Sequence, residues 1–187
     1  LEFMEVSGVQ ANPTLAFCRE AIEKVKPYGP DFILAVGGGS AIDTAKMIAN
    51  SIAMDCDPWE ICYDGKPITK SLPVGAVLTI AAAGSETSFN AVLTDTEVGF
   101  KSGCSGDLNR PLFAIMNPEL TYTLPNYQLA CGIVDIMMHT MERYIALDDG
   151  DNDLTDRMAE GLLKAVIRAG KTAYENNTDW ESHATLM

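Results

Sequence analysis

Two side chains inside an apolar segment with helical character have the types and the spacing of a metal-binding pair. Asp135 and His139 stand four residues apart within the stretch from Leu129 to Leu147, so on a helix both side chains lie on one face, one turn apart. Burying a carboxylate among apolar side chains is costly unless a cation or hydrogen bonds receive it. A carboxylate and an imidazole together suit a divalent transition metal. The alternative is a polar pair whose hydrogen bonds are satisfied by the neighbouring backbone.

The rest of the sequence does not complete such a site. Only two histidines are present, His139 and His183, and the acidic residues form no cluster, so the chain cannot close a four-ligand site by itself. Glu142 follows His139 by three residues and is expected to face solvent. Ser85 is not part of a Gly-x-Ser-x-Gly motif, which disfavours a serine hydrolase. The sequence therefore offers part of a metal site.

A second candidate site is the run Gly37-Gly38-Gly39-Ser40, which separates a short apolar segment from a helical pattern. Glycines let the backbone approach an anion closely, and the N–H groups and dipole at a helix start favour negative charge. The run is neither a Gly-x-Gly-x-x-Gly motif, because Ile42 occupies the third glycine position, nor a Walker A loop. It predicts either a phosphate site of the kind found in nucleotide-binding sheets, or a tight turn that packs a helix on a strand.

Two further features could belong to the same cofactor cleft. Small residues from Thr79 to Ser85 follow another apolar segment, and ligands of open parallel sheets gather at the carboxyl ends of the strands. Lys101, in a predicted hairpin, could reach an anionic or ribose group. Taken separately, the small residues are also explained by close packing and the lysine by solvation. Together with the glycine run, they favour a cofactor cleft.

These residues must be positioned by strands and helices whose pattern changes near residue 125. Apolar segments predict a strand at residues 3–6 and buried strands at residues 32–36, 73–80 and 112–116, and residues 90–94 and 100–101 are typical of a hairpin. Helices are expected from an Asn12 cap to Lys26, from Ala41 to Ile52 with Asp43 and Lys46 off the apolar face, and over residues 126–147, 153–175 and from 179 onwards. The sequence therefore predicts an α/β domain over residues 1–124 and the start of an all-helical domain over residues 125–187.

Composition excludes several classes of partner. The formal charge of −13 and the pI of about 4.4 argue against binding to nucleic acid or to an anionic membrane surface. No apolar run is long enough for a transmembrane helix, and the N-terminus lacks a signal-peptide pattern. The five cysteines include no Cys-x-x-Cys pair and are expected to be reduced thiols of a cytoplasmic protein. The chain begins and ends within regular patterns, which suggests a piece of a longer protein.

Several of these motifs resemble the iron-containing (group III) alcohol dehydrogenases, in particular the butanol dehydrogenase-like branch. The stretch from Ala35 to Lys46 is similar to the cofactor loop of that family, and the stretch from Pro125 to Tyr144 is similar to its metal-binding helix. Between them, the segment from Leu78 to Glu86, Lys101 and Asn117-Pro118 follow in the family's order and spacing. The resemblance covers nearly the whole chain.

The resemblance implies a Rossmann-like dinucleotide domain, here without its first elements, followed by a helical domain in a dehydroquinate synthase-like architecture. It implies that Asp135 and His139 are the first two of four ligands to a divalent metal, iron or zinc, and that His183 is not a ligand. Ala83 stands where many members carry a threonine that contacts the nicotinamide side. The NAD or NADP site would be lined by Gly37, Gly38, Gly39, Ser40, Asp43, Thr79, Ala83, Lys101 and Leu124.

By the same resemblance, the parent protein interconverts a small primary alcohol and an aldehyde by hydride transfer with NAD or NADP, and it forms a homodimer. With two of four metal ligands, the 187-residue chain is expected to bind metal poorly and to turn over little. Two alternatives remain open. One is a glycerol dehydrogenase-like or dehydroquinate synthase-like relative on the same scaffold, and the other is a non-catalytic fragment that binds a nucleotide.

Overall fold

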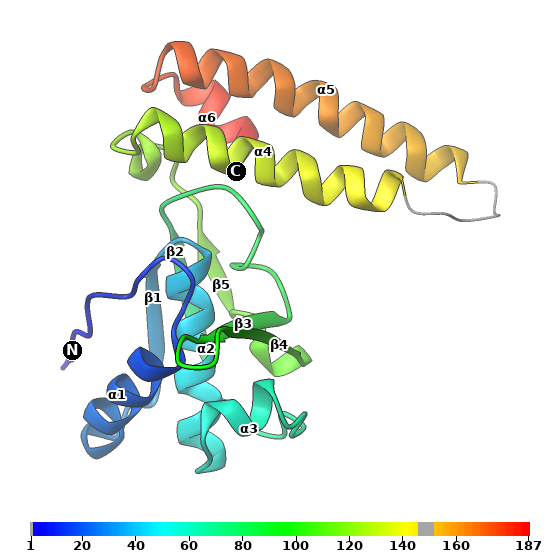
Figure 1. Cartoon of the computed structure of the whole chain (residues 1–187). Coiled ribbons are helices and arrows are strands. Elements are labelled where there is room, and N and C mark those ends of the chain that lie inside the picture. Colours follow the sequence, from blue (N-terminus) through cyan, green and yellow to red (C-terminus); the bar gives the residue numbers. More distant parts are fainter. Residues whose placement is uncertain (1, 146–151) are drawn as a thin grey trace. The chain divides into compact units, whose positions relative to one another are not determined.

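The computed structural model of the chain describes residues 2–145 and 152–187. It consists of two compact units (Figure 1). The sheet unit comprises Leu1–Leu78 and Gly84–Ile115, and the helical unit comprises Thr79–Ala83 and Met116–Met187. The domain boundary suggested by the sequence, between residues 124 and 125, stays a prediction.

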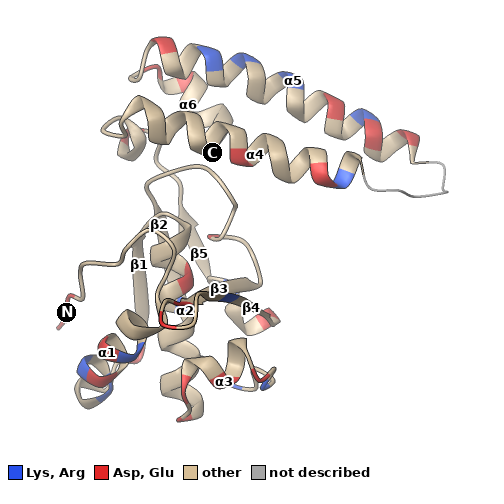
Figure 2. Ribbon diagram, viewed as in Figure 1, with Lys and Arg blue, Asp and Glu red and all other residues tan. Residues whose placement is uncertain are grey.

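The sheet unit is built on three parallel strands in the order β1-β2-β5. Strand β1 is Ile33–Gly37, β2 is Val74–Leu78 and β5 is Phe113–Ile115. In this register Ile33 lies opposite Val74, and Gly75 lies opposite Phe113. None of the three strands carries a charged residue, as Figure 2 shows, which is typical of strands in a parallel α/β sheet. The predicted parallel sheet is therefore confirmed.

Three α-helices and a hairpin complete this unit. Helix α1 is Leu15–Val25, α2 is Gly39–Met54 and α3 is Pro58–Cys62, and the antiparallel hairpin pairs β3, Asn90–Asp95, with β4, Phe100–Ser105. Two 3-10 turns follow α1 and β4, η1 at Lys26–Tyr28 and η2 at Asp107–Asn109. The main core lies between the helices and the hairpin, and it contains Leu15, Cys18, Met47, Ile48, Ile61, Cys62, Ala91 and Leu93.

The predicted N-terminal elements differ from those observed. Residues 3–6 form no strand, and Phe3 is exposed, because among the described residues no strand pairs with this segment. Asn12 does not cap α1, since its φ of 62° is left-handed whereas an N-cap residue is extended. Thr14 is the cap instead, and its hydroxyl accepts a hydrogen bond from the Phe17 N–H at 3.3 Å.

The expectation of fully buried strands holds for β2 but is wrong for β1 and β5. Leu34 and Val36 are 51% and 62% exposed, and Ile115 is 49% exposed. Side chains alternate between the two faces of a strand, and the intervening Ala35 is buried in the same unit as α2, which packs on β1. On the face that carries these three side chains, the stacked rings of Phe32 and Phe113 lie over Gly75, and the three side chains themselves stay about half exposed.

The helical unit contains one 3-10 turn and three α-helices, η3 at Pro118–Thr121, α4 at Asn126–Tyr144, α5 at Asp153–Glu175 and α6 at Trp180–Leu186. The predicted helices are present, although the predicted end of the first, residues 146–147, lies outside the described residues. Helix α5 runs back along α4 (Figure 1). The core of the unit contains Leu129, Val166, Ala169, Ala173 and Leu186.

Two glycines allow close packing in this unit. A Cβ atom on Gly132 of α4 would lie 2.4 Å from the backbone oxygen of Ala81, and one on Gly170 of α5 would lie 2.8 Å from Ile133 Cγ2. Real Cβ atoms do not approach other atoms so closely. The segment Thr79–Ala83 therefore lies directly against α4. No helix formed by the described residues is long and apolar enough to span a membrane.

Candidate functional site

The glycine run forms the junction between β1 and α2. Strand β1 ends at Gly37, Gly38 is the N-cap of α2, and the helix begins at Gly39. Gly37 has a φ of 156°, and a Cβ atom there would lie 2.7 Å from Ala41 Cβ. A side chain at Gly37 would thus collide with the first turn of the helix, so glycine is required for this tight turn.

The start of α2 has the features of an anion-binding helix terminus. No side chain of the described residues caps it. The N–H groups of Ala41 and Ile42 bond to the Gly38 oxygen at 3.0 and 3.1 Å. The N–H groups of the two helical residues before them, Gly39 and Ser40, have no acceptor within the helix. These groups and the helix dipole favour a negative charge at Gly39 and Ser40. The loop thus serves as a tight turn and also presents donors to an anion.

Asn12 links this loop to Lys101. The Asn12 N–H donates to Ser40 Oγ at 3.2 Å, and Lys101 Nζ donates to Asn12 Oδ1 at 3.3 Å. All three side chains are at least partly open to solvent. Asparagine tolerates the left-handed backbone that this bridge requires better than most residues do. Sequence reasoning treated Asn12 as a helix cap and missed this position.

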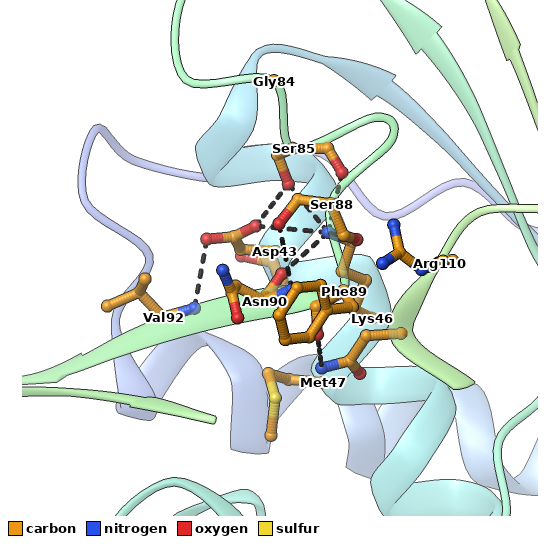
Figure 3. Close-up of polar contacts among 12 residues, drawn as sticks. Asp43, Lys46, Met47, Gly84, Ser85, Ser88, Phe89, Asn90, Val92 and Arg110 are labelled. Atoms are coloured by element: carbon orange, nitrogen blue, oxygen red, sulfur yellow. Dashed lines mark hydrogen bonds and ion pairs between the residues drawn. The ribbon is translucent and has the colours of Figure 1, made fainter. Parts of the chain in front are cut away.

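A buried ammonium lies in the middle of α2. Lys46 is fully buried, which corrects the expectation that it lies off the buried face of the helix. Its Nζ donates to the oxygens of Ser85, Ser88 and Asn90 at 2.7, 3.1 and 2.8 Å and to Ser85 Oγ at 3.0 Å (Figure 3). Four acceptors surround three N–H groups, so the ammonium is satisfied. Lys46 thereby ties α2 to the segment that precedes β3.

Asp43 completes this network. Ser85 Oγ donates to Asp43 Oδ1 at 2.5 Å, the Val92 N–H donates to Asp43 Oδ2 at 3.1 Å, and Lys46 Nζ lies 3.9 Å from Asp43 Oδ1 (Figure 3). Burial raises the pKa of Asp43, and the hydrogen bond from Ser85 and the charge of Lys46 oppose this shift. Burial lowers the pKa of Lys46, against the charges of Asp43 and Glu86. All three ammonium protons have acceptors, so Lys46 holds α2 to the segment from Ser85 to Asn90.

The structure divides the predicted cofactor residues between the two units. Six of them, Gly37, Gly38, Gly39, Ser40, Asp43 and Lys101, belong to the sheet unit. The other three, Thr79, Ala83 and Leu124, belong to the helical unit. In that unit the Leu124 oxygen accepts a hydrogen bond from Asn177 Nδ2 at 3.0 Å. The first group is therefore brought together by a bonded network, and the second by packing around α4.

Asp135 and His139 lie on one face of α4, as predicted. His139 Nε2 is 3.8 Å from Asp135 Oδ2, which is longer than a hydrogen bond, and the side chains are 50% and 45% exposed. Within the described residues neither side chain bonds to backbone, so the alternative of a backbone-satisfied pair is not observed. The pair offers one nitrogen and one oxygen donor on an open surface, which fits two ligands of a divalent metal.

No group of three or more His, Cys, Asp or Glu side chains suited to a metal occurs in the part of the chain that the structure describes. Asp135 lies instead in a shallow, mostly apolar groove along α4, lined by Tyr127, Ala130, Cys131, Val134, Asp135 and Met138. The expectation that this chain carries two of four metal ligands stays a prediction.

Comparison with known proteins identifies the family. A family model described as iron-containing alcohol dehydrogenase matches residues 1–118, and one described as the C-terminal part of the Fe-containing alcohol dehydrogenase family matches residues 129–187. The chain belongs to the iron-containing alcohol dehydrogenase family. The first match includes the glycine run and Lys101, and the second includes Asp135 and His139.

Individual relatives agree with this family. An NADH-dependent butanol dehydrogenase A of Clostridium acetobutylicum is 40% identical over the whole chain, which spans 48% of that protein. An NADPH-dependent aldehyde reductase of Escherichia coli is 36% identical over the whole chain and is spanned to 49%. The crystal structure of a Thermotoga maritima NADH-dependent butanol dehydrogenase A superposes with a TM-score of 0.94 at 35% identity, covering 100% of this chain and 46% of that one.

The chain thus spans about half the length of these iron-containing alcohol dehydrogenases. The structural similarity also confirms the predicted fold class, a partial Rossmann-like parallel sheet followed by a helical domain. Because the relatives differ in the cofactor that their names state, NADH or NADPH, family membership alone does not decide between the two for this chain.

His183 is the second histidine of the chain, and it is buried in the helical unit. Its Nδ1 lies 2.6 Å from Thr121 Oγ1, which itself donates to the Pro118 oxygen at 2.6 Å. A hydroxyl carries one hydrogen, so Nδ1 must be the donor to Thr121, and the imidazole is the neutral Nδ1–H tautomer. Nε2 is buried without a partner among the described residues. His183 is therefore a buried histidine of the helical core, and its exclusion from the metal ligands stays a prediction.

Acid is expected to destabilise the helical unit through His183. Burial lowers the pKa of His183 from its ordinary value of 6.5, against the attraction of Asp179. Below pH 6.5 the unfolded chain therefore binds a proton that the folded chain does not, and the free energy of unfolding falls by up to about 1.4 kcal/mol per pH unit. Urea unfolding of a Trp59→Phe variant, followed by the fluorescence of Trp180, measures this slope.

The control for this pH dependence is the exposed histidine. His183→Gln should flatten the slope between pH 6.5 and lower pH, whereas His139→Gln should leave it unchanged. An undiminished slope in the His183→Gln variant would contradict the assignment.

Proposed function

We propose that this chain is part of an NAD(P)-dependent, metal-dependent alcohol dehydrogenase that interconverts a small primary alcohol and an aldehyde. The observation that carries the proposal is the loop Gly37–Ser40, which joins a parallel strand to an uncapped helix start within a chain of the iron-containing alcohol dehydrogenase family. A dinucleotide supplies the diphosphate anion that such a loop can receive.

Each part of the loop has a proposed task. The N–H groups at the start of α2 would bind the diphosphate, and Gly39 would let the backbone approach it. Asn12 holds Ser40 and Lys101 together, so the ammonium of Lys101 would lie near the anionic or ribose part of the same cofactor. Asp43 and Lys46 keep the segment at Ser85 in place beside the loop.

Asp135 and His139 would hold a divalent metal, with further ligands from outside the described residues. Bound there, a metal supplies Lewis acidity, which acidifies an alcohol and polarises an aldehyde carbonyl. The nicotinamide ring supplies the acceptor or donor of the hydride.

The Gly39→Ala variant tests the cofactor loop on the 187-residue chain itself. A Cβ atom at Gly39 would lie 3.8 Å from Ser85 Cβ, an ordinary contact, so the fold should be unchanged. The added methyl group would stand where the diphosphate approaches, and binding of NADH or NADPH should weaken by about tenfold or more. Isothermal titration calorimetry measures both dissociation constants, with thermal unfolding as the check on folding.

The matched control is Gly161→Ala, at a helical glycine of α5 with no atom within 4 Å of the added carbon. It should leave the dissociation constants unchanged. If the unmodified chain binds neither nucleotide, or if Gly39→Ala binds as tightly as the unmodified chain, the loop is a packing turn and the cofactor proposal fails.

The whole reaction is tested on the parent protein. We expect butanal reduction that is lost after metal chelation and restored by Fe²⁺ or Zn²⁺, and that is abolished in Asp135→Asn and His139→Gln variants. Nucleotide binding without hydride transfer to any aldehyde would instead indicate a relative with other chemistry on this scaffold. Alcohol oxidation by the 187-residue chain with stoichiometric metal would contradict the requirement for more ligands.

A further inference from the structure

Four of the five cysteines lie in or against the main core of the sheet unit, Cys18, Cys56, Cys62 and Cys104. Two of them contact the same thioether. Cys62 Sγ lies 3.8 Å and Cys104 Sγ 3.5 Å from Met47 Sδ. Sequence reasoning treated all five cysteines as separate reduced thiols, because no short spacing pairs them. The fold brings two of them to one place.

The backbone around this pair is fixed by a hydrogen bond. Cys62 is the last residue of α3, and its backbone oxygen accepts from Ser102 Oγ of β4 at 2.6 Å. Residues two apart on a strand point to the same face, so Cys104 faces the same helix end as Ser102. The thioether of Met47 thus lies within 3.8 Å of both thiols.

The two thiols have different surroundings. Cys62 is 4% exposed, whereas Cys104 is partly exposed. The neighbouring Cys104 thiol, with burial, raises the pKa of Cys62, while the neighbouring Cys62 thiol and the Asn109 amide lower the pKa of Cys104. Asn109 Nδ2 lies 3.9 Å from Cys104 Sγ. The accessible thiol is thus the one that ionises more easily, and the buried thiol keeps its proton.

We propose that Cys62 and Cys104 are an oxidation-sensitive pair that closes to an intramolecular disulfide in the presence of hydrogen peroxide. The proposal rests on the placement of the two sulfurs and is independent of the proposed enzymatic function. Joining α3 to β4 would close a loop across the hairpin that carries Lys101.

The reaction balances with the peroxide as the only oxidant. The Cys104 thiolate attacks one peroxide oxygen, so an S–O bond forms, the O–O bond breaks, and the second oxygen leaves as water after protonation. The Cys62 thiol then attacks the sulfur of this sulfenic acid. An S–S bond forms, the S–O bond breaks, and the hydroxyl leaves as water with the Cys62 proton. Two thiols lose two electrons and two protons, and one peroxide becomes two waters.

Peptide mapping tests the pair on the unmodified chain. The folded protein is treated with hydrogen peroxide, free thiols are blocked with N-ethylmaleimide, and the digest is analysed by mass spectrometry with and without reduction. The expected product is one peptide pair linked through Cys62 and Cys104 that separates on reduction. Cys18 should remain a free thiol until the chain unfolds, because burial raises its pKa to about 12.

Variants assign the roles of the two sulfurs. Cys104→Ser should abolish the linked peptide and leave Cys62 unoxidised, and Cys62→Ser should let Cys104 accumulate as a sulfenic acid that dimedone traps. Cys131→Ser, which removes an exposed thiol of the other unit, should leave the linkage unchanged. Recovery of both Cys62 and Cys104 as free thiols while Cys131 is oxidised would overturn the proposal, as would linkage of either residue to Cys18 or Cys56.

Discussion

Replacement of Lys46 by methionine is expected to lower the free energy of unfolding of the sheet unit by about 3–5 kcal/mol, the range for removing one partner of a buried, paired charge. Methionine fills a similar volume but donates no hydrogen bond. The variant leaves three backbone oxygens, those of Ser85, Ser88 and Asn90, without the donor they have in the folded state. It also leaves the buried Asp43 carboxylate without its cation. The unsatisfied buried oxygens account for part of this cost.

One tryptophan in each unit makes this loss measurable. Trp59 lies in α3 of the sheet unit and Trp180 in α6 of the helical unit, so a Trp180→Phe background leaves Trp59 as the reporter for the sheet unit. Urea unfolding followed by Trp59 fluorescence should show a lower midpoint for Lys46→Met. The matched control is Lys24→Met, whose ammonium is on the surface beside Glu20 and should leave the midpoint unchanged.

The Lys46 network also predicts a difference between two substitutions. Lys46→Arg keeps the charge but brings a planar, larger group into a site shaped for a compact ammonium, so it should restore only part of the stability. If Lys46→Met unfolds at the same urea concentration as the unmodified chain, the buried ammonium contributes no net stability and its role as the clamp of the Ser85 segment is wrong.

Lys46 also shows why the sequence predicted the glycine loop better than the hydrogen-bond network beside it. The run Gly37–Ser40 is a local pattern, since four consecutive residues specify the turn and the helix start. The partners of Lys46 lie 39 to 44 positions away, and most of them are backbone oxygens, which every residue type carries. Nothing in the sequence distinguishes such an acceptor, so a lysine inside a helix is interpreted as a surface residue.

Asn12 was missed for a related reason. It joins residues that are 28 and 89 positions away in the sequence, Ser40 and Lys101. The local signal, an asparagine before a proline, is shared by helix caps and by left-handed turns. Only the left-handed backbone found in the structure separates these possibilities. The burial of β1 was overestimated for a related reason. The apolar side chains of Leu34 and Val36 are suited to a buried position, but the local sequence does not show whether another element packs on them.

The shared face of Asp135 and His139 was predicted correctly because it depends on helical periodicity alone, and their role as metal ligands stays a prediction. Asp135 and His139 share a face in any α-helix over this segment, and the structure places them there. Where that helix lies relative to the strand exit depends on Gly132, three residues before Asp135. The approach of α4 to the segment Thr79–Ala83, which contains two proposed cofactor residues, is possible because position 132 has no side chain.

Gly132→Ala is therefore expected to destabilise the helical unit even though alanine favours helices. The new Cβ atom would lie 2.4 Å from the Ala81 oxygen, and because this is a backbone atom, α4 or the strand exit must move. Such overpacking costs about 3 kcal/mol, and the helix propensity of alanine returns about 1 kcal/mol. The net fall in the free energy of unfolding is about 2 kcal/mol. Trp180 fluorescence in a Trp59→Phe background reports it.

Gly161→Ala is expected to raise the free energy of unfolding of the same unit. Gly161 lies within α5, and an added Cβ atom meets nothing within 4 Å, so only the propensity term acts and stability should rise by about 1 kcal/mol. Two equal substitutions in neighbouring helices should thus shift the urea midpoint in opposite directions. If both raise it, α4 does not lie directly against Ala81, and the close approach of α4 to the segment Thr79–Ala83 would have to be abandoned. In the parent protein, Gly132→Ala should also lower alcohol oxidation, because the displaced helix carries both Asp135 and His139.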